Sequence, residues 1–277
     1  MTTTGVCSPV PARHRATALL GLLVEFSLSG QEPPVPPGEW VEDPWDLWWA
    51  CYRAACPAPA DLGHAMARPR ACPRCARQVR TLLDGTVPGH PQDLPGGPCG
   101  CLRAWAVAMR RPAPEADWPA HRVSVALTKP GCPAVRTVEL LRAEGCTVVE
   151  NRMVHLRRSD VRRLYPEAYG AQFVHAQDAY LTSAPSRVVV LLLPDHWAMN
   201  PAGLKRAVRA ALGGTDVLRN HLHMPDNPAD ALCDLTHLAG PTLTERLYDR
   251  HERPRIGERL DGYRRVVEQP RRGTRAG

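Results

Sequence analysis

The sequence lacks any long hydrophobic run. No segment of its 277 residues reaches the roughly 20 consecutive apolar residues that cross a bilayer. The nearest approach is residues 16–24, which Glu25 ends with no small-residue cleavage site after it. We therefore expect a buried helix there rather than a signal peptide, no membrane partner, and a cytoplasmic location.

Lysine and aromatic residues are both scarce. Lysine occurs only as Lys129 and Lys205, although the formal net charge is +7 and the pI is about 9.0, so nearly all of the basic charge is arginine. A basic chain suggests nucleic acid, but an arginine bias beside abundant Ala, Pro and Gly also fits a GC-rich genome. Lys129 therefore stands out as a position that needs a compact ammonium group.

The length predicts two domains. Five of the seven tryptophans fall between Trp40 and Trp105, which indicates a separate core in the first half. We place a Trp/Cys-rich N-terminal module at residues 1–109, a Pro-rich linker at 110–121, an α/β domain at 122–240 and an Arg-rich tail at 241–277. We expect the arginines from Arg250 onward to lie on a solvated, mobile tail, or to form an electrostatic arm for nucleic acid.

The N-terminal module reads as mostly helical. Leucines at helical spacing predict one helix over residues 16–26, and a second should begin near Asp43 or Pro44. Its tryptophans are expected to form a small buried core. The alternative is an exposed aromatic platform for a partner or a base.

Two cysteine pairs lie in this module, Cys72-x-x-Cys75 and Cys99-x-Cys101. Two such pairs can supply the four thiolates of a structural zinc site, with Cys56 or His64 as substitutes for one ligand. Because no export signal precedes them, disulfides are not expected. Unligated thiols and a redox-active C-x-x-C pair remain the alternatives to zinc.

After the linker the pattern changes to alternating strands and helices. Strands are predicted over residues 123–128, 146–156, 187–193 and 217–223, and helices over 133–144, from 159, over 201–212 and from 226 or 227 to 238. This order indicates a ferredoxin-like split βαβ fold in the α/β (α+β) class. Because a strand alternates its side chains between faces, His221 and His223 should point to the same side of the last strand.

The end of the last predicted strand and the three residues after it read Arg219-Asn220-His221-Leu222-His223-Met224-Pro225-Asp226. It resembles the active-site segment of the nucleoside diphosphate kinase family, Arg-Asn-x-x-His-x-x-Asp, in which the histidine accepts the phosphate. The resemblance places that nucleophile at His223. It places the carboxylate that orients it at Asp234, where the family has a Glu. A neutral imidazole held by a carboxylate is a competent nucleophile near neutral pH.

The resemblance covers about residues 122–238, and further positions match it in order. They are Lys129-Pro130, Tyr165, Phe173, Tyr180, Ser183-Ala184-Pro185, Arg209 and Thr215. It implies that Lys129, Tyr165, Arg209 and Thr215 contact phosphates, that Phe173 stacks on the base, and that Asn220 lies in the nucleotide site. It also implies a magnesium ion bound with the nucleotide. Read without the resemblance, these positions are ordinary core aromatics and solvated cations.

The sequence departs from the family near the histidine. A family loop of about twenty residues with a second phosphate-contacting Arg is missing between Thr215 and Arg219. Met224-Pro225 replaces the family's Gly-Ser, and Asp234 is shorter than Glu. We therefore expect a monomer or dimer rather than the family's hexamer. The leading hypothesis is a nucleoside triphosphate phosphotransferase working through a phosphohistidine. A catalytically impaired nucleotide-binding module and a nucleic-acid-binding protein are the alternatives.

Overall fold

A computed structural model describes residues 12–35, 37–40, 43–55, 72–86, 89–111, 117–168, 170–213 and 216–268. The chain divides into two compact units. One contains the described residues up to Asp117 together with residues 167–170 and those from Leu260 onward, and the other contains Trp118–Pro166 and Ala171–Arg259. Across the described residues, no helix has the length and apolar character needed to cross a membrane.

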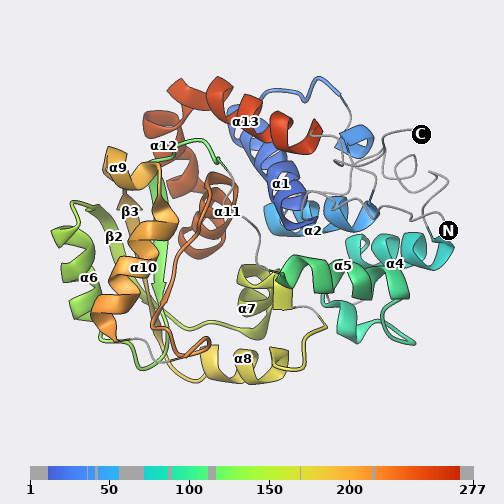
Figure 1. The fold of residues 1–277 in the computed structure, drawn as a ribbon, viewed down its shortest axis with the longest axis horizontal. Coiled ribbons are helices and arrows are strands. Elements are labelled where there is room, and N and C mark those ends of the chain that lie inside the picture. The colour runs from blue at the N-terminus through green and yellow to red at the C-terminus, as the bar shows by residue number, and fades with distance from the viewer. Residues whose placement is uncertain are drawn as a thin grey trace, which may run out of the picture. The chain divides into compact units, whose positions relative to one another are not determined.

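The first unit is helical, as predicted. Its helices are α1 (Ala12–Ser29), α2 (Pro44–Ala54), α4 (Pro73–Leu83) and α5 (Gly100–Arg110), with short 3-10 turns η1 (Pro37–Trp40) and η2 (Pro91–Asp93) (Figure 1). Helix α2 begins where the sequence indicates, because Asp43 accepts a hydrogen bond from the Trp45 amide at 3.0 Å and Pro44 fixes the first turn.

The tryptophans of α2 are buried, so the core interpretation is confirmed and the exposed platform is wrong for this helix. Trp45 and Trp48 are fully buried, and Trp49 is 3% exposed. Trp48 meets Trp105 of α5 edge to face with ring centroids 6.0 Å apart, and the Trp105 indole donates to Asp46 at 2.6 Å. The described helices of this unit therefore pack around aromatic rings, with Trp48 and Trp105 in edge-to-face contact.

The second unit is built on a four-stranded antiparallel sheet of order β2-β3-β1-β4. The strands are β1 (Val123–Thr128), β2 (Thr147–Val154), β3 (Ser186–Leu192) and β4 (Leu222–His223). Strands β1 and β2 are joined through α6 (Ala134–Ala143), with β3 inserted between them, which is the split βαβ arrangement. The predicted fold class is thus confirmed.

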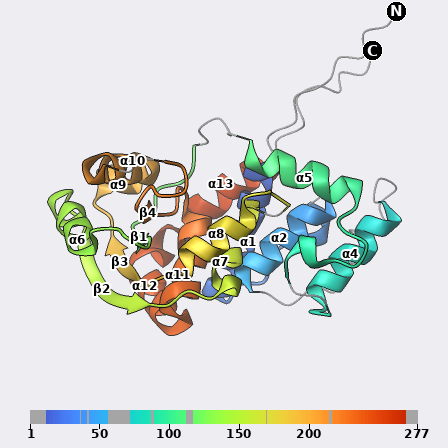
Figure 2. The ribbon, with the colours of Figure 1, turned by 90° about the horizontal axis from the view of Figure 1, so that it is seen from below.

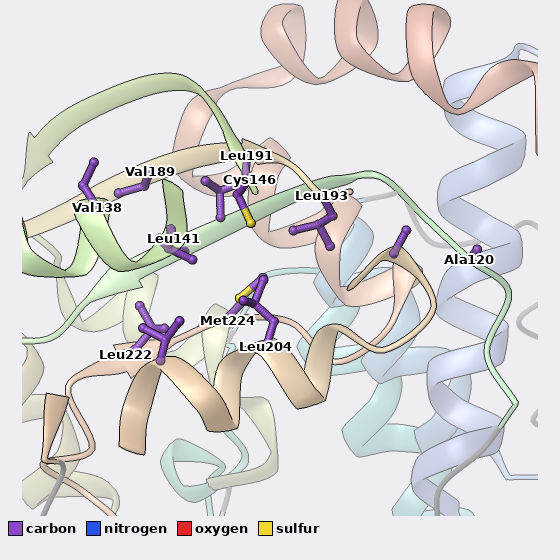
Figure 3. Packing of buried hydrophobic residues seen from close by; sticks show 13 residues of the cluster. Ala120, Val138, Leu141, Cys146, Val189, Leu191, Leu193, Leu204, Leu222 and Met224 are labelled. Atoms are coloured by element: carbon purple, nitrogen blue, oxygen red, sulfur yellow. The ribbon is translucent and has the colours of Figure 1, made fainter. Parts of the chain in front are cut away.

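Helices cover both faces of this sheet, which explains why β1 is buried along its whole length. On one face lie α6, the short α9 (Asp195–Ala198) and α10 (Pro201–Leu212) (Figure 2). Figure 3 shows Val138 and Leu141 of α6, Leu204 of α10, and Val189 and Leu191 of β3 converging in this core. The sheet is therefore a fixed platform for the segment that carries His223.

The other face is covered by α7 (Arg158–Leu164), α8 (Val174–Leu181), α11 (Pro228–Ala239) and α12 (Pro241–His251). The 3-10 turn η3 (Pro166–Ala168) lies between α7 and α8. Helix α11 begins at Asn227, whose side chain accepts from the Asp230 amide at 2.9 Å, and Pro228 occupies its first position. These start signals place Asp234 in the second turn of α11, facing the sheet.

The predicted last strand is wrong in extent. It was expected over residues 217–223, but β4 contains only Leu222 and His223. His221 has a backbone φ of 66°, in the left-handed region, and so it is not part of a regular strand. Strand alternation therefore does not extend to His221, and the expectation that His221 and His223 point the same way loses its basis in a regular strand.

The predicted Arg-rich tail is also wrong over residues 241–268. Helix α12 is followed by η4 (Arg253–Arg255) and α13 (Ile256–Glu268). Arg259 is 1% exposed and donates to Glu252 at 2.9 Å, and Glu252 in turn accepts from the backbone amides of Arg122 and Val123 at 2.7 Å. Residues 269–277 lie outside the described range.

Three arginines of this region pair with nearby carboxylates. Arg253 pairs with Asp249 at 2.6 Å, Arg255 with Glu258 at 2.8 Å and Arg264 with Asp261 at 3.3 Å. The nucleic-acid hypothesis was based on the Arg-rich tail together with the zinc module, and it stays a prediction. Ala120 and His121, which we assigned to the linker, are buried.

Candidate functional site

His223 and Asp234 form the centre of the site. The His223 Nε2 lies 2.7 Å from Asp234 Oδ2, and their side chains are 14% and 1% exposed. Strand pairing positions His223 opposite Leu127 of β1, while the second turn of α11 supplies Asp234. An ionised carboxylate only accepts hydrogen bonds, so Nε2 carries the proton and the lone pair is on Nδ1.

Tyr165 and Lys129 lie beside the histidine. The Tyr165 ring meets the imidazole edge to face with centroids 4.8 Å apart, and the Lys129 Nζ lies 5.7 Å from the Tyr165 ring centroid. Lys129 directly follows β1, and its backbone amide donates to the His221 carbonyl at 2.8 Å. The ends of β1 and α7 thus bring a cation and a phenol close to His223.

The Lys129 ammonium is held by the chain itself. Its Nζ donates to the Leu218 carbonyl at 3.0 Å, and the residue is only 4% exposed. Burying an ammonium group is unfavourable unless hydrogen bonds replace its water. The segment that replaces the family's loop therefore supplies one of the acceptors that stabilise Lys129.

Arg209 extends from α10 to the same place. Its Nε and Nη2 donate to the Leu222 carbonyl at 2.9 and 2.6 Å. Burial lowers the pKa of Arg209, and the neighbouring Tyr165 and Asp226 oppose that shift. Because Leu222 precedes His223, these two hydrogen bonds hold in place the backbone that carries the imidazole. Helix α10 is held close by a second contact, in which Lys205 Nζ lies 2.5 Å from Asp226 Oδ1.

The other residues predicted to contact the nucleotide are not gathered around His223 in the same way. Phe173 lies just before the first turn of α8 and is 53% exposed, and no contact among the described residues joins it to the His223 group. Tyr180 donates to the Pro130 carbonyl at 2.7 Å and so supports the turn after Lys129. The Asn220 amide donates to the Val217 carbonyl at 2.8 Å. Thr215 lies outside the described residues.

Sequence reasoning missed the two backbone carbonyls that hold Lys129 and Arg209, and it missed the Lys205–Asp226 pair. Backbone acceptors carry no sequence signal. The rarity of lysine, which singled out Lys129, applies equally to Lys205 and is the one signal that points to the pair.

The predicted zinc ligands lie near the starts of two helices. Cys72 precedes α4 and Cys99 precedes α5, where the Cys99 sulfur accepts from the Leu102 amide at 3.3 Å. Within the described ranges, no group of three or more Cys, His, Asp or Glu side chains is arranged to hold a metal ion. Zinc therefore has no support from this geometry. The substitutes Cys56 and His64 fall outside the described residues.

The sheet order and the His223–Asp234 pair together define the class of this unit: a ferredoxin-like α/β domain that presents a carboxylate-bound histidine at the end of its edge strand. No family model matches the chain. A curated mouse protein, "Nucleoside diphosphate kinase homolog 5", is 31% identical over 98 residues, which cover 31% of this chain and 46% of the relative. The chain thus spans about half the length of the curated relative that it matches.

The structure is also similar to three solved nucleoside diphosphate kinases, and each match covers 43% of this chain. The Aquifex aeolicus enzyme is 17% identical with a TM-score of 0.37, over 95% of its own chain. The Halobacterium salinarum enzyme in complex with CDP is 16% identical with a TM-score of 0.35, over 87% of its chain. The Encephalitozoon cuniculi enzyme is 14% identical with a TM-score of 0.37, over 90% of its chain. The similarity to the curated relative and the sheet topology together identify the α/β unit as a nucleoside-diphosphate-kinase-like domain.

Proposed function

We propose that this protein is a nucleotide-binding phosphotransferase that transfers the γ-phosphate of a nucleoside triphosphate through a phosphohistidine at His223. The observation that carries the proposal is the 2.7 Å contact between His223 Nε2 and Asp234 Oδ2. It leaves Nδ1 with the lone pair, and it places a negative charge where the imidazole becomes more positive on attack. The similarity to a nucleoside diphosphate kinase homolog supports the same chemistry.

In the proposed reaction, the Nδ1 lone pair of His223 forms a bond to the γ-phosphorus while the bond from that phosphorus to the bridging oxygen breaks. A nucleoside diphosphate leaves with the electron pair of that bond. An acceptor diphosphate then takes the phosphoryl group from His223 by the reverse step. Asp234 keeps the Nε2 proton in place throughout, so the ring remains in one tautomer.

Lys129, Arg209 and Tyr165 are the described groups that would meet the phosphates. Phosphoryl transfer depends mainly on alignment and on positive groups around the charged oxygens. A triphosphate would take over the hydrogen bonds that the Leu218 and Leu222 carbonyls now receive from the two cations. We assign Thr215 to the phosphates, Asn220 to the nucleotide site and the exposed Phe173 ring to the base, because an aromatic ring can stack on any nucleobase.

A magnesium ion would arrive with the nucleotide, held by its phosphate oxygens, and would neutralise charge on the transferred group. The described residues fit this arrangement because they offer cations and a phenol to the phosphates rather than a cage of carboxylates. We also propose that the chain is a monomer or a dimer rather than a hexamer, since the subunit-packing loop is missing. Light scattering that finds six chains per particle would contradict this.

A catalytically impaired nucleotide-binding module is the second candidate, and a specific observation favours it. Both cations of the site donate to the protein's own carbonyls, and Met224 is buried where the family has Gly. Losing one charge-assisted contact to a transition state commonly costs about 10² to 10³ in rate. Such a module would bind nucleotide and never carry phosphate.

Incubation of the full chain with γ-labelled ATP and magnesium tests both candidates. Acid-labile, base-stable label on the protein supports the phosphotransferase, because a phosphorylated histidine nitrogen has that stability. Saturable binding of ATP without label supports the binding module. If ATP neither binds nor labels the protein, both proposals are wrong.

A further inference from the structure

Residues 216–221 form a short strap across Lys129. Two hydrogen bonds join this strap to the lysine. The Lys129 Nζ donates to the Leu218 carbonyl at 3.0 Å, and the Lys129 backbone amide donates to the His221 carbonyl at 2.8 Å. Lys129 is only 4% exposed. The ammonium group is therefore bound by the strap and covered, and a phosphate oxygen reaches it only when part of this cover moves.

Asp216 gives the strap its shape. Its Oδ1 accepts from the backbone amides of Leu218 at 2.7 Å and Arg219 at 2.5 Å. A side-chain oxygen bound to amides two and three residues later closes a tight turn, and this turn directs the Leu218 carbonyl toward Lys129. The Arg219 amide, followed by the Leu218 amide and the charges of Arg219 and Lys129, lowers the pKa of Asp216. The carboxylate is thus ionised at neutral pH.

The outer side of the strap is free to move away from the unit. Asp216 and Arg219 are exposed, and Val217 is 93% exposed. Moving these residues outward therefore uncovers little of their own apolar surface. At the other end, Leu222 is fully buried in β4 and anchors the strap to the sheet.

The backbone of the strap is strained at His221. Its φ of 66° lies in the left-handed region, which is unfavourable for a residue with a Cβ. The Leu222 amide donates to the Asn220 carbonyl at 2.7 Å and so closes a three-residue turn around it. Hydrogen bonds thus stabilise the closed strap while backbone strain opposes it. A ligand that binds Lys129 better in the open state can shift such a balance.

We propose that the strap competes with nucleotide phosphates for Lys129, and that Asp216 is the residue that keeps it closed. When a nucleotide binds, phosphate oxygens replace the Leu218 carbonyl at the Lys129 Nζ, and the strap moves outward. The apparent affinity is then the intrinsic affinity reduced by the fraction of molecules whose strap is open. This competition rests on the nucleotide site proposed at His223, and it makes Asp216 a positioning residue that acts through Leu218.

The scarcity of lysine gives a direct measure of the strap. Lys129 and Lys205 are the only two lysines of the chain. Acetylation of the full chain with an N-hydroxysuccinimide ester at neutral pH, followed by peptide mass spectrometry, gives a separate rate for each. The Lys129 rate reports how often the strap opens. Lys205, whose Nζ lies 2.5 Å from Asp226 Oδ1, reports whether the rest of the site keeps its structure.

Two variants separate the hydrogen bonds of Asp216 from its charge. Asp216→Ala removes both, whereas Asp216→Asn removes the charge and keeps an oxygen that accepts from the same amides. We expect Lys129 to be acetylated about five- to tenfold faster in Asp216→Ala than in Asp216→Asn, because a lost hydrogen bond shifts an equilibrium by such a factor. The Lys205 rate should be the same in both variants and in the wild-type protein.

Calorimetry with ATP and magnesium tests the competition itself. The Kd of Asp216→Ala should be lower than that of Asp216→Asn by the same factor by which Lys129 is acetylated faster. Equal Lys129 rates in the two variants would overturn the role of Asp216, and faster acetylation with an unchanged or higher Kd would overturn the competition. If ATP binds to none of the three proteins, the nucleotide site is wrong and the competition with it. Acetylation is measured without nucleotide, so this failure is distinguishable from a failure of the strap.

Discussion

His223 and Asp234 are separated by eleven residues in the chain and by 2.7 Å between Nε2 and Oδ2 in the structure. Asp234 is almost fully buried in α11, and His223 ends the edge strand beside it. Burying a carboxylate is costly unless hydrogen bonds replace its water, and the imidazole of His223 supplies one such bond.

Replacing the proposed nucleophile should separate catalysis from binding. We expect His223→Gln to abolish phosphoprotein formation and to change ATP affinity by no more than about twofold, because ground-state binding is assigned to Lys129, Arg209 and Phe173. His221→Gln is the matched control, since its left-handed backbone separates it from the strand that carries His223. Equal labelling of the wild-type protein and of His223→Gln would contradict the assignment of His223 as the nucleophile.

Changing the carboxylate should slow the chemistry and spare the binding. Asp234→Asn keeps the shape of the side chain, but the amide no longer fixes the tautomer of His223 or offsets the positive charge that forms on its imidazole. The rate of phosphorylation should therefore fall by a factor of about 10² to 10⁴. Rapid-quench labelling with γ-labelled ATP measures the rate, and calorimetry measures the affinity. Asp230→Asn at the start of the same helix is the control. A rate unchanged in Asp234→Asn would assign this carboxylate to structure alone.

Glu252 should contribute strongly to the stability of the second unit. It is 2% exposed, accepts from the amides of Arg122 and Val123, and pairs with the buried Arg259. Removing one partner of a buried ion pair costs about 3–5 kcal/mol, because the other charge stays buried. Glu252→Ala should therefore lower the urea midpoint markedly. Glu258→Ala, in an exposed pair with Arg255, should cost less than about 1 kcal/mol.

Gly21 should be required in α1 for packing rather than for flexibility. A Cβ on Gly21 would overlap the ring of Tyr263, which is fully buried within the same unit. Gly21→Ala should destabilise the protein by about 1–3 kcal/mol, although Ala favours a helix by about 1 kcal/mol. Gly257→Ala in α13 meets no atom within 4 Å and should be neutral or stabilising. Thermal unfolding compares the two.

His121 should make the second unit sensitive to mild acid. Burial, and then Arg259, lower its pKa from 6.5 to about 3, so the unfolded chain binds a proton between these pH values that the folded chain does not. Stability is therefore full above about pH 6.5 and falls as the pH drops toward 3. Between pH 7 and 5 the loss should be on the order of 2 kcal/mol. His121→Leu should reduce that loss in urea titrations, and an equal loss in both proteins would contradict the assignment.

Local signals were sufficient for many elements. The predicted bounds of β1 and α10 coincide with the observed ones, because a run of apolar residues ends at Lys129-Pro130 and because Asn200, Pro201 and Gly213 mark the ends of the helix. Helix α11 and its N-cap follow from the same kind of signal. Such signals act within a few residues and do not depend on the rest of the fold.

The helices after residue 240 were missed because their arginines appeared to have nothing to bind. Some of these partners come from distant parts of the chain. Glu252 accepts hydrogen bonds from Arg259 and from two backbone amides at the start of β1, which lie some 130 residues before it in sequence. Composition alone does not distinguish a paired, buried arginine from a solvated one.

The sequence by itself determined the order of strands and helices in the second unit, the resemblance at His223, and the spacing that pairs it with Asp234. Only the tertiary structure decided that β4 is two residues long and that Lys129 and Arg209 donate to backbone carbonyls. The physical reason is that periodicity and capping are properties of neighbouring residues. The partner of a buried charge is determined by packing between distant segments, which leaves no pattern in either segment alone.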